Sequence, residues 1–211
     1  MTWGERTVEV PWMLTKIKEG SILDIGSAES CYVNELLEKN PTKLTLNDIR
    51  SFSTHEQDSR VSCVTGDSRK LNITDFGGEK FDNVLCISTL EHMGLEAYGQ
   101  QKDHNENPCD SQIKYLKYIL DSYLKNNGQL ILTIPYGKYE HGGWVIVYNK
   151  EAVDKIKTIF KLKEEVYFTL IDRDKDTWKE VSKEKCPLKG MDHYNGNMRA
   201  TSVACLILEK R

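Results

Sequence analysis

The chain has 211 residues, enough for one domain with a substantial hydrophobic core. Its formal net charge of -3 argues against a general nucleic-acid-binding protein, because such proteins more often present a strongly basic face. No apolar run approaches the roughly 20 residues that a membrane span needs, and no signal peptide opens the chain. We therefore expect a cytoplasmic protein with no membrane contact, as a monomer or homodimer.

The six cysteines are scattered and form no Cys-x-x-Cys pair. Three of them, Cys63, Cys86 and Cys205, lie inside apolar stretches, where a reduced cysteine packs as a small hydrophobic side chain. This spacing argues against a zinc site or a disulfide framework.

The first 20 residues mix apolar and charged side chains, and Pro11 favours a short helix immediately after it. Two interpretations stay open for this segment. It either packs over one face of a sheet or forms a lid over the site that follows.

Residues 21–30 predict a buried strand that ends at a turn. Ile22, Leu23 and Ile25 suit a central parallel strand, and the small residues from Gly26 onward allow a ligand to approach the backbone closely. Helical spacing then continues to Asn40. A strand, a glycine turn and a helix in this order predict a nucleotide-type site at the carboxyl edge of a sheet.

Further strands and helices alternate along the chain. Strands are predicted over residues 43–48, 60–65, 81–88, 129–134, 160–170 and 202–208, and helices over 112–125 and 150–159, the latter capped by Asn149. Residues 171–201 are polar and lack periodicity, so they are predicted to be an insertion before the last strand. The pattern predicts a single layered α/β domain over residues 1–211, with a largely parallel sheet.

Acidic residues follow two of the predicted strands. Asp48 ends the second strand, where an acid accepts the ribose hydroxyls of a nucleoside, although turns and helix caps also use acids. Gly66-Asp67-Ser68 follows the third strand.

Five motifs in order, from Ser21 to Pro135, resemble the class I S-adenosylmethionine-dependent methyltransferases. They are Leu23-Asp24-Ile25-Gly26-Ser27-Ala28, Asp48, Gly66-Asp67-Ser68, Phe81-Asp82 and Ser88-Thr89-Leu90-Glu91-His92. The resemblance implies a Rossmann-like, seven-stranded, mostly parallel sheet with helices on both faces and an antiparallel last strand. The glycine turn departs from the usual Gly-x-Gly-x-Gly, because Ala28 and Ser30 replace two glycines. A nicotinamide dehydrogenase fits less well, since Cys31 stands where its last glycine belongs.

The resemblance also implies a binding role for each motif, with S-adenosylmethionine as the cofactor. The backbone of Gly26, Ser27 and Ala28 contacts its methionine part, and Asp24 orders that turn. Asp48 holds the ribose hydroxyls, with Ile49 beside it. Asp67 and Ser68 recognise the adenine, and Ser88 and Leu90 line the floor near the sulfonium.

Glu91 and His92 are the predicted catalytic residues. Histidine titrates near neutrality, so His92 is a natural base for a hydroxyl acceptor, although it equally suits a structural role in its loop. Small-RNA 2′-O-methyltransferases carry a related motif that binds a metal, but Ser88 replaces its first glutamate here, so no metal is expected. Asp103, His104 and Glu106 could supply other metal ligands, but their hydrophilic surroundings favour a solvated loop. Asp103 and His104 remain secondary candidates for metal or acceptor contacts.

Tyr136, His141 and Trp144, in the loop after the fifth strand, are predicted to contact the acceptor. The acceptor is predicted to be a small polar molecule, with an oxygen of a saccharide or other metabolite as the target atom. Two alternatives stay open: an RNA or nucleotide methyltransferase, and a cofactor-binding interaction module without turnover.

Overall fold

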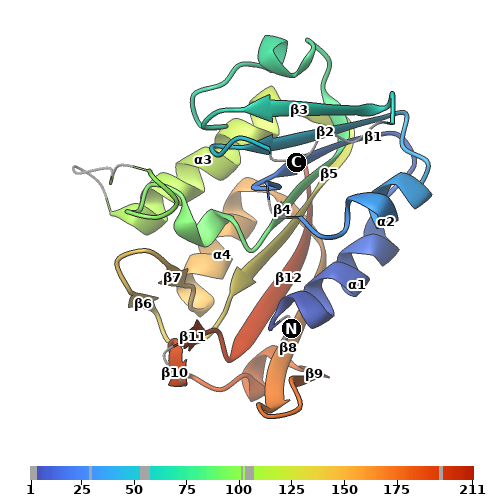
Figure 1. Cartoon of the computed structure of the whole chain (residues 1–211). Helices are drawn as coiled ribbons and strands as arrows, with labels where there is room; N and C mark the ends of the chain where they lie inside the picture. The colour runs from blue at the N-terminus through green and yellow to red at the C-terminus, as the bar shows by residue number, and fades with distance from the viewer. Residues whose placement is uncertain (1–3, 29, 53–57, 101, 103–106, 195–196) are drawn as a thin grey trace.

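The computed structural model describes residues 4–28, 30–52, 58–100, 102, 107–194 and 197–211. Its main sheet has eight strands in the order β3-β2-β1-β4-β5-β12-β8-β9 (Figure 1). The strands are β1 (Ser21–Ile25), β2 (Lys43–Asp48), β3 (Val61–Thr65), β4 (Phe81–Ile87), β5 (Leu124–Pro135), β8 (Lys161–Asp172), β9 (Thr177–Val181) and β12 (Ser202–Glu209). The first five pair in parallel, whereas β12 runs antiparallel to both β5 and β8. The predicted parallel sheet with an antiparallel last strand is confirmed.

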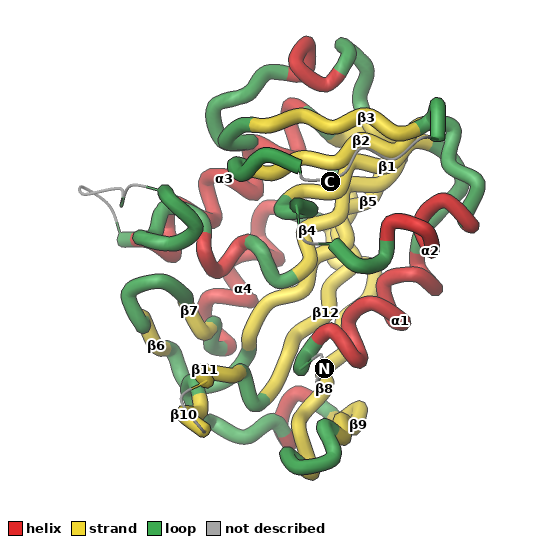
Figure 2. The backbone as a smooth tube through the Cα atoms, viewed as in Figure 1, coloured by secondary structure: helices red, strands yellow, loops and turns green. Residues whose placement is uncertain are grey.

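Helices cover both faces of this sheet, as Figures 1 and 2 show. On one face lie α1 (Arg6–Lys16) and α2 (Val33–Glu38), and on the other α3 (Pro108–Ser122) and α4 (Lys150–Ile159). The 3₁₀ helices are η1 (Ile73–Phe76), η2 (Leu90–His92) and η3 (Lys183–Lys185). Two small hairpins complete the fold, β6 (Glu140–His141) with β7 (Ile146–Val147) and β10 (Asp192–Tyr194) with β11 (Asn197–Arg199).

The central strand β4 shows why the sequence forms this layered structure. Val84 and Cys86 pack in the core under α3 and α4, whereas Leu85 and Ile87 pack in the core under α1 and α2. Because successive side chains of a strand point to opposite faces, a strand covered on both faces needs apolar residues at consecutive positions. The four consecutive apolar residues from Val84 to Ile87, within the strand predicted over residues 81–88, have this cause.

The eighth strand corrects the prediction of seven. β9 lies within the segment 171–201, predicted to be an insertion without periodicity, and pairs antiparallel with β8 at the edge of the sheet. Its five residues are all exposed or half-buried. An edge strand whose residues are at most half-buried needs no regular apolar alternation, so the sequence shows no periodicity there.

Three element boundaries also differ from prediction. The helix predicted after Pro11 begins at Arg6 and contains Pro11. α3 begins at Pro108 because the Asn107 side chain caps it, accepting from the backbone N–H of Cys109 at 3.0 Å. It ends at Ser122, and the predicted helix terminator Asn127-Gly128 lies in β5.

Among the described residues, no helix is long and apolar enough to cross a membrane.

Candidate ligand-binding site

A cavity of about 190 Å³ opens where four neighbouring parallel strands end. Gly26 follows β1, Asp48 ends β2, Asp67 follows β3 and Ser88 follows β4, and all four residues line it. The strand order brings these carboxyl ends together, because β3, β2, β1 and β4 are adjacent. Open α/β sheets bind ligands in such a crevice, outside the carboxyl ends of their strands.

The turn after β1 requires glycine for two reasons. Gly26 has φ +84°, in the left-handed region, and a Cβ there would lie 2.3 Å from the Thr89 hydroxyl oxygen. The Gly26 N–H donates to the backbone oxygen of Asn47 at 2.7 Å. The turn is therefore fixed between β2 and the segment after β4.

Asp48 is the most fully hydrogen-bonded acid of the cavity wall. Its carboxylate accepts from the backbone N–H of Ala28 at 3.0 Å and from the Arg50 backbone N–H, Nε and Nη2 at 2.9 to 3.2 Å. Burial acts to raise the pKa of Asp48, but these hydrogen bonds outweigh burial, so the pKa is lowered. The carboxylate is therefore ionised at neutral pH.

Asp67 repeats the same local geometry after β3. It accepts from the backbone N–H of Arg69 at 3.0 Å and from Nε and Nη2 of the same residue at 2.9 and 2.8 Å. Its neighbour Ser68 also lines the cavity and accepts a hydrogen bond from the Tyr115 hydroxyl at 2.7 Å. Two adjacent strands thus end in ionised carboxylates that face one cavity.

Helix α1 contributes two charged side chains that the sequence analysis did not single out. Arg6 lines the cavity and donates to the backbone oxygen of Ile87 at 3.0 Å. Glu9, one turn later, is fully buried and accepts from the Ser88 hydroxyl at 2.6 Å. The sequence signal was an Arg-Glu pair at i, i+3 spacing, which exposed helices also use for surface ion pairs.

His92 stands at the edge of the cavity with one ring nitrogen occupied. Nδ1 lies 2.8 Å from the backbone oxygen of Trp144, and since a carbonyl only accepts, Nδ1 carries the proton. Nε2 is therefore the acceptor nitrogen of the ring. Burial lowers the pKa of His92 below its ordinary value, so the neutral imidazole dominates at pH 7.

Aromatic rings surround His92. Trp144 stacks on it with ring centroids 5.1 Å apart and an interplanar angle of 13°, and Tyr98 meets it edge-on at 5.1 Å. The Arg50 guanidinium lies 4.7 Å from the centroid of the Tyr98 ring. These contacts fix the imidazole, and Tyr98 also lines the cavity.

Several predicted residues lie beside the cavity rather than in its wall. Asp24 is buried below the turn, 3.3 Å from the Ser30 hydroxyl, and burial raises its pKa to about 7. The Ser27 hydroxyl donates to the backbone oxygen of Asn47, and Leu90 packs in the core. Of the predicted cofactor-binding residues, Gly26, Asp48, Ile49, Asp67, Ser68 and Ser88 line the cavity.

The predicted catalytic and acceptor residues are also divided. Glu91 is buried outside the cavity wall, and burial raises its pKa well above the ordinary value. Trp144 touches the site because its ring stacks on His92. Tyr136, by contrast, is buried against Tyr167, and His141 is exposed in β6.

The secondary metal candidates Asp103, His104 and Glu106 lie outside the described residues. Within the described part of the chain, no group of three or more His, Cys, Asp or Glu side chains is placed to hold a metal ion.

Comparison with known proteins gives structural relatives only. No family model and no curated protein matches the sequence. The N-methyltransferase NodS from Bradyrhizobium japonicum, solved with S-adenosylhomocysteine, superposes with a TM-score of 0.60 at 11% identity, covering 98% of this chain and 85% of its own. The 1,6-didemethyltoxoflavin-N1-methyltransferase of Burkholderia thailandensis gives 0.57 at 14% identity, covering 99% of this chain and 79% of its own. A SAM-dependent methyltransferase from Leishmania major superposes with a TM-score of 0.59 at 10% identity, covering 95% of this chain and 70% of its own. The chain has the fold of the class I S-adenosylmethionine-dependent methyltransferases.

Proposed function

We propose that this chain is an S-adenosylmethionine-dependent methyltransferase that methylates an oxygen of a small polar acceptor, such as a saccharide. One observation carries the proposal. A single cavity combines the Gly26 turn with the ionised carboxylates of Asp48 and Asp67, on a fold shared with methyltransferases.

The donors and acceptors of the cavity fit the cofactor. Asp48 and Asp67 each accept several N–H donors of an arginine at the end of the same strand. A ribose diol and an adenine amino group likewise present donors, so they suit the same carboxylates once the arginine side chains turn away. When bound, S-adenosylmethionine supplies an electrophilic methyl group on a sulfonium.

His92 supplies the base in this proposal. Its Nε2 accepts the proton of the acceptor hydroxyl, while the hydrogen bond from Nδ1 to Trp144 and the stacked Trp144 ring hold the imidazole in place. The 36% exposed Trp144 and the 49% exposed Tyr98 then offer aromatic surface to the acceptor at the mouth of the cavity. Two of the structural relatives are N-methyltransferases, so the choice of oxygen rests on His92 alone.

Calorimetric titration with S-adenosylhomocysteine tests the proposal. We expect binding to the parent protein and a loss of more than tenfold in Asp48→Ala, because a hydrogen bond to a charged group contributes about 1.5–3 kcal/mol.

Asp58→Ala is the matched control for this titration. Asp58 holds Arg60 through the same three N–H donors, but immediately before β3 and therefore at the opposite edge of the sheet. It should leave the affinity unchanged. The absence of any affinity in the parent protein would refute the proposed function.

A further inference from the structure

Glu9 is a buried carboxylate one hydroxyl group away from the cavity. Its side chain is 0% exposed, and its Oε1 accepts from the Ser88 hydroxyl, which belongs to a residue of the cavity wall. Its Oε2 has no hydrogen-bond partner among the described residues. A buried acid that is incompletely hydrogen-bonded costs stability, a cost that functional sites often carry.

The backbone of Ser88 is held in place, and its hydroxyl is directed toward Glu9. Ser88 has φ +41°, which is uncommon for a residue other than glycine, and its N–H donates to the Thr133 hydroxyl oxygen at 2.9 Å. Burial raises the pKa of Glu9, whereas the Arg6 guanidinium and the Ser88 hydroxyl favour its ionised form. The Ser88 hydroxyl donates to Glu9 Oε1 across 2.6 Å, within the range for a hydroxyl on a carboxylate. Because a serine hydroxyl has one proton and Glu9 accepts it, Ser88 has only oxygen lone pairs left for the cavity.

A second buried acid and one cation lie close to Glu9. Burial raises the pKa of Glu91 well above its ordinary value, and the charge of Glu9 raises it further. One of the Glu91 oxygens also lacks a hydrogen-bond partner among the described residues. Arg6 is the cation nearest to Glu9, with 4.0 Å between Nη1 and Oε2. Removing the charge of Glu9 therefore leaves Arg6 unbalanced and makes this wall more positive.

We propose that Glu9, acting through the Ser88 hydroxyl, makes the cavity bind the cationic methyl donor in preference to its neutral product. The inference rests on the proposed function, in which the methyl group is transferred beside His92. Ser88 and His92 both follow β4, so the sulfonium lies on this side of the cavity. The sulfonium carries a positive charge, whereas the thioether of S-adenosylhomocysteine is neutral, so a positioned carboxylate favours the donor and promotes release of the product.

The test compares the dissociation constants of S-adenosylmethionine and S-adenosylhomocysteine by calorimetric titration. In Glu9→Gln we expect the preference for S-adenosylmethionine to fall about tenfold relative to the parent protein, which corresponds to about 1.4 kcal/mol. The affinity for S-adenosylhomocysteine should stay within about twofold. A structural defect alone would weaken the binding of both ligands together. An unchanged ratio of the two dissociation constants would therefore overturn the inference.

Two further variants complete the test. Ser88→Ala removes the hydroxyl that connects Glu9 with the cavity, so it should also lower the preference for S-adenosylmethionine over S-adenosylhomocysteine. If Glu9→Gln does not fold, the result for Ser88→Ala tests the inference. Glu165→Gln makes the same substitution at a hydrogen-bonded glutamate of β8 outside the cavity wall and should leave the ratio unchanged. If the parent protein binds neither ligand, the proposed function itself fails. If it binds both and the variants keep its ratio, only the role of Glu9 fails.

Discussion

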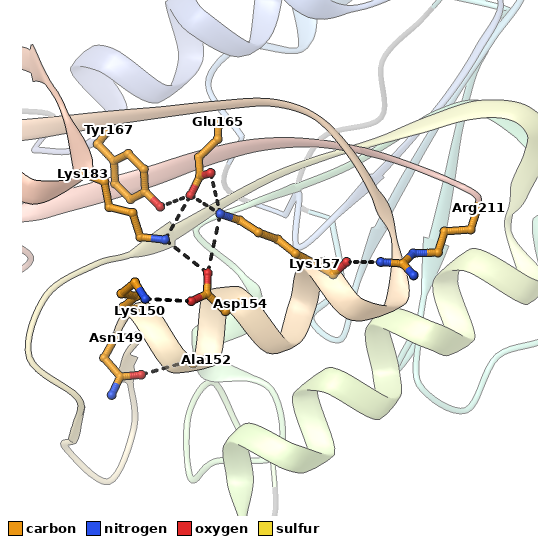
Figure 3. Close-up of polar contacts among 9 residues, drawn as sticks. All are labelled: Asn149, Lys150, Ala152, Asp154, Lys157, Glu165, Tyr167, Lys183 and Arg211. Atoms are coloured by element: carbon orange, nitrogen blue, oxygen red, sulfur yellow. Dashed lines mark hydrogen bonds and ion pairs between the residues drawn. The ribbon is translucent and has the colours of Figure 1, made fainter.

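Two clusters of charged side chains in this fold are balanced in opposite ways. In the cluster around Glu165 on β8, Lys157, Lys183 and the Tyr167 hydroxyl all donate to one carboxylate, the first at 2.6 Å (Figure 3). Burial would raise the pKa of Glu165, but these donors lower it. Behind the cavity, by contrast, burial raises the pKa of both Glu9 and Glu91, and each has an oxygen without a partner among the described residues.

The difference separates a structural cluster from a candidate functional site. The charges around Glu165 satisfy one another and hold α4, β8 and η3 together. Those behind the cavity remain incompletely satisfied, a condition that functional sites often keep at a cost in stability. Three predictions test this contrast.

The largest effect is expected at His92. His92→Ala should slow turnover by about 10²–10⁴-fold, the usual contribution of a general base, while affinity for S-adenosylhomocysteine stays nearly unchanged. The measurement is release of S-adenosylhomocysteine across a panel of hydroxyl-bearing metabolites. Tyr167→Phe, in the Glu165 cluster, is the control and should retain turnover. Undiminished turnover in His92→Ala would remove His92 as the base.

A smaller effect is expected for the turn. Gly26 and Gly78 share φ +84°, but a Cβ at Gly26 would overlap Thr89, whereas a Cβ at Gly78 meets no atom within 4 Å. Gly78→Ala should therefore cost about 1 kcal/mol of unfolding free energy for its backbone conformation. Gly26→Ala should cost about 1–3 kcal/mol more for the overlap and should also weaken cofactor binding. Equal losses in denaturant unfolding would show that the turn does not depend on Thr89.

The smallest effect concerns stability against pH. The pKa of Glu91 is raised above its ordinary value of 4.5 in the folded protein, so the folded state loses stability as pH rises above about 4.5. The lowered pKa of Glu165 acts in the opposite direction, because its contribution is present above about 4.5 and is lost as pH falls. Glu91→Gln should flatten the alkaline side of a plot of Tm against pH, and Glu165→Gln the acid side, each by about 2–4 °C. Identical profiles for the two variants would contradict the contrast.

Strand ends were predictable from sequence, whereas contacts across the sheet were not. Asp48 ends one predicted strand and Asp67 follows the next, so their meeting at one edge followed from the parallel order of the strands. Glu9 gave no such signal, because a charged residue on a helix is usually exposed, and only the packing of α1 against the end of β4 buries it. The contact between His92 and Trp144 joins residues 52 positions apart and also escaped prediction.

A crystal structure with S-adenosylhomocysteine bound tests the central claim most directly. We expect the ligand in the cavity after β1–β4, with its ribose hydroxyls on Asp48, the Arg50 side chain turned away and the sulfur on the side of Ser88 and His92. A ligand bound elsewhere, or Arg50 still holding Asp48 with the ligand present, would contradict it.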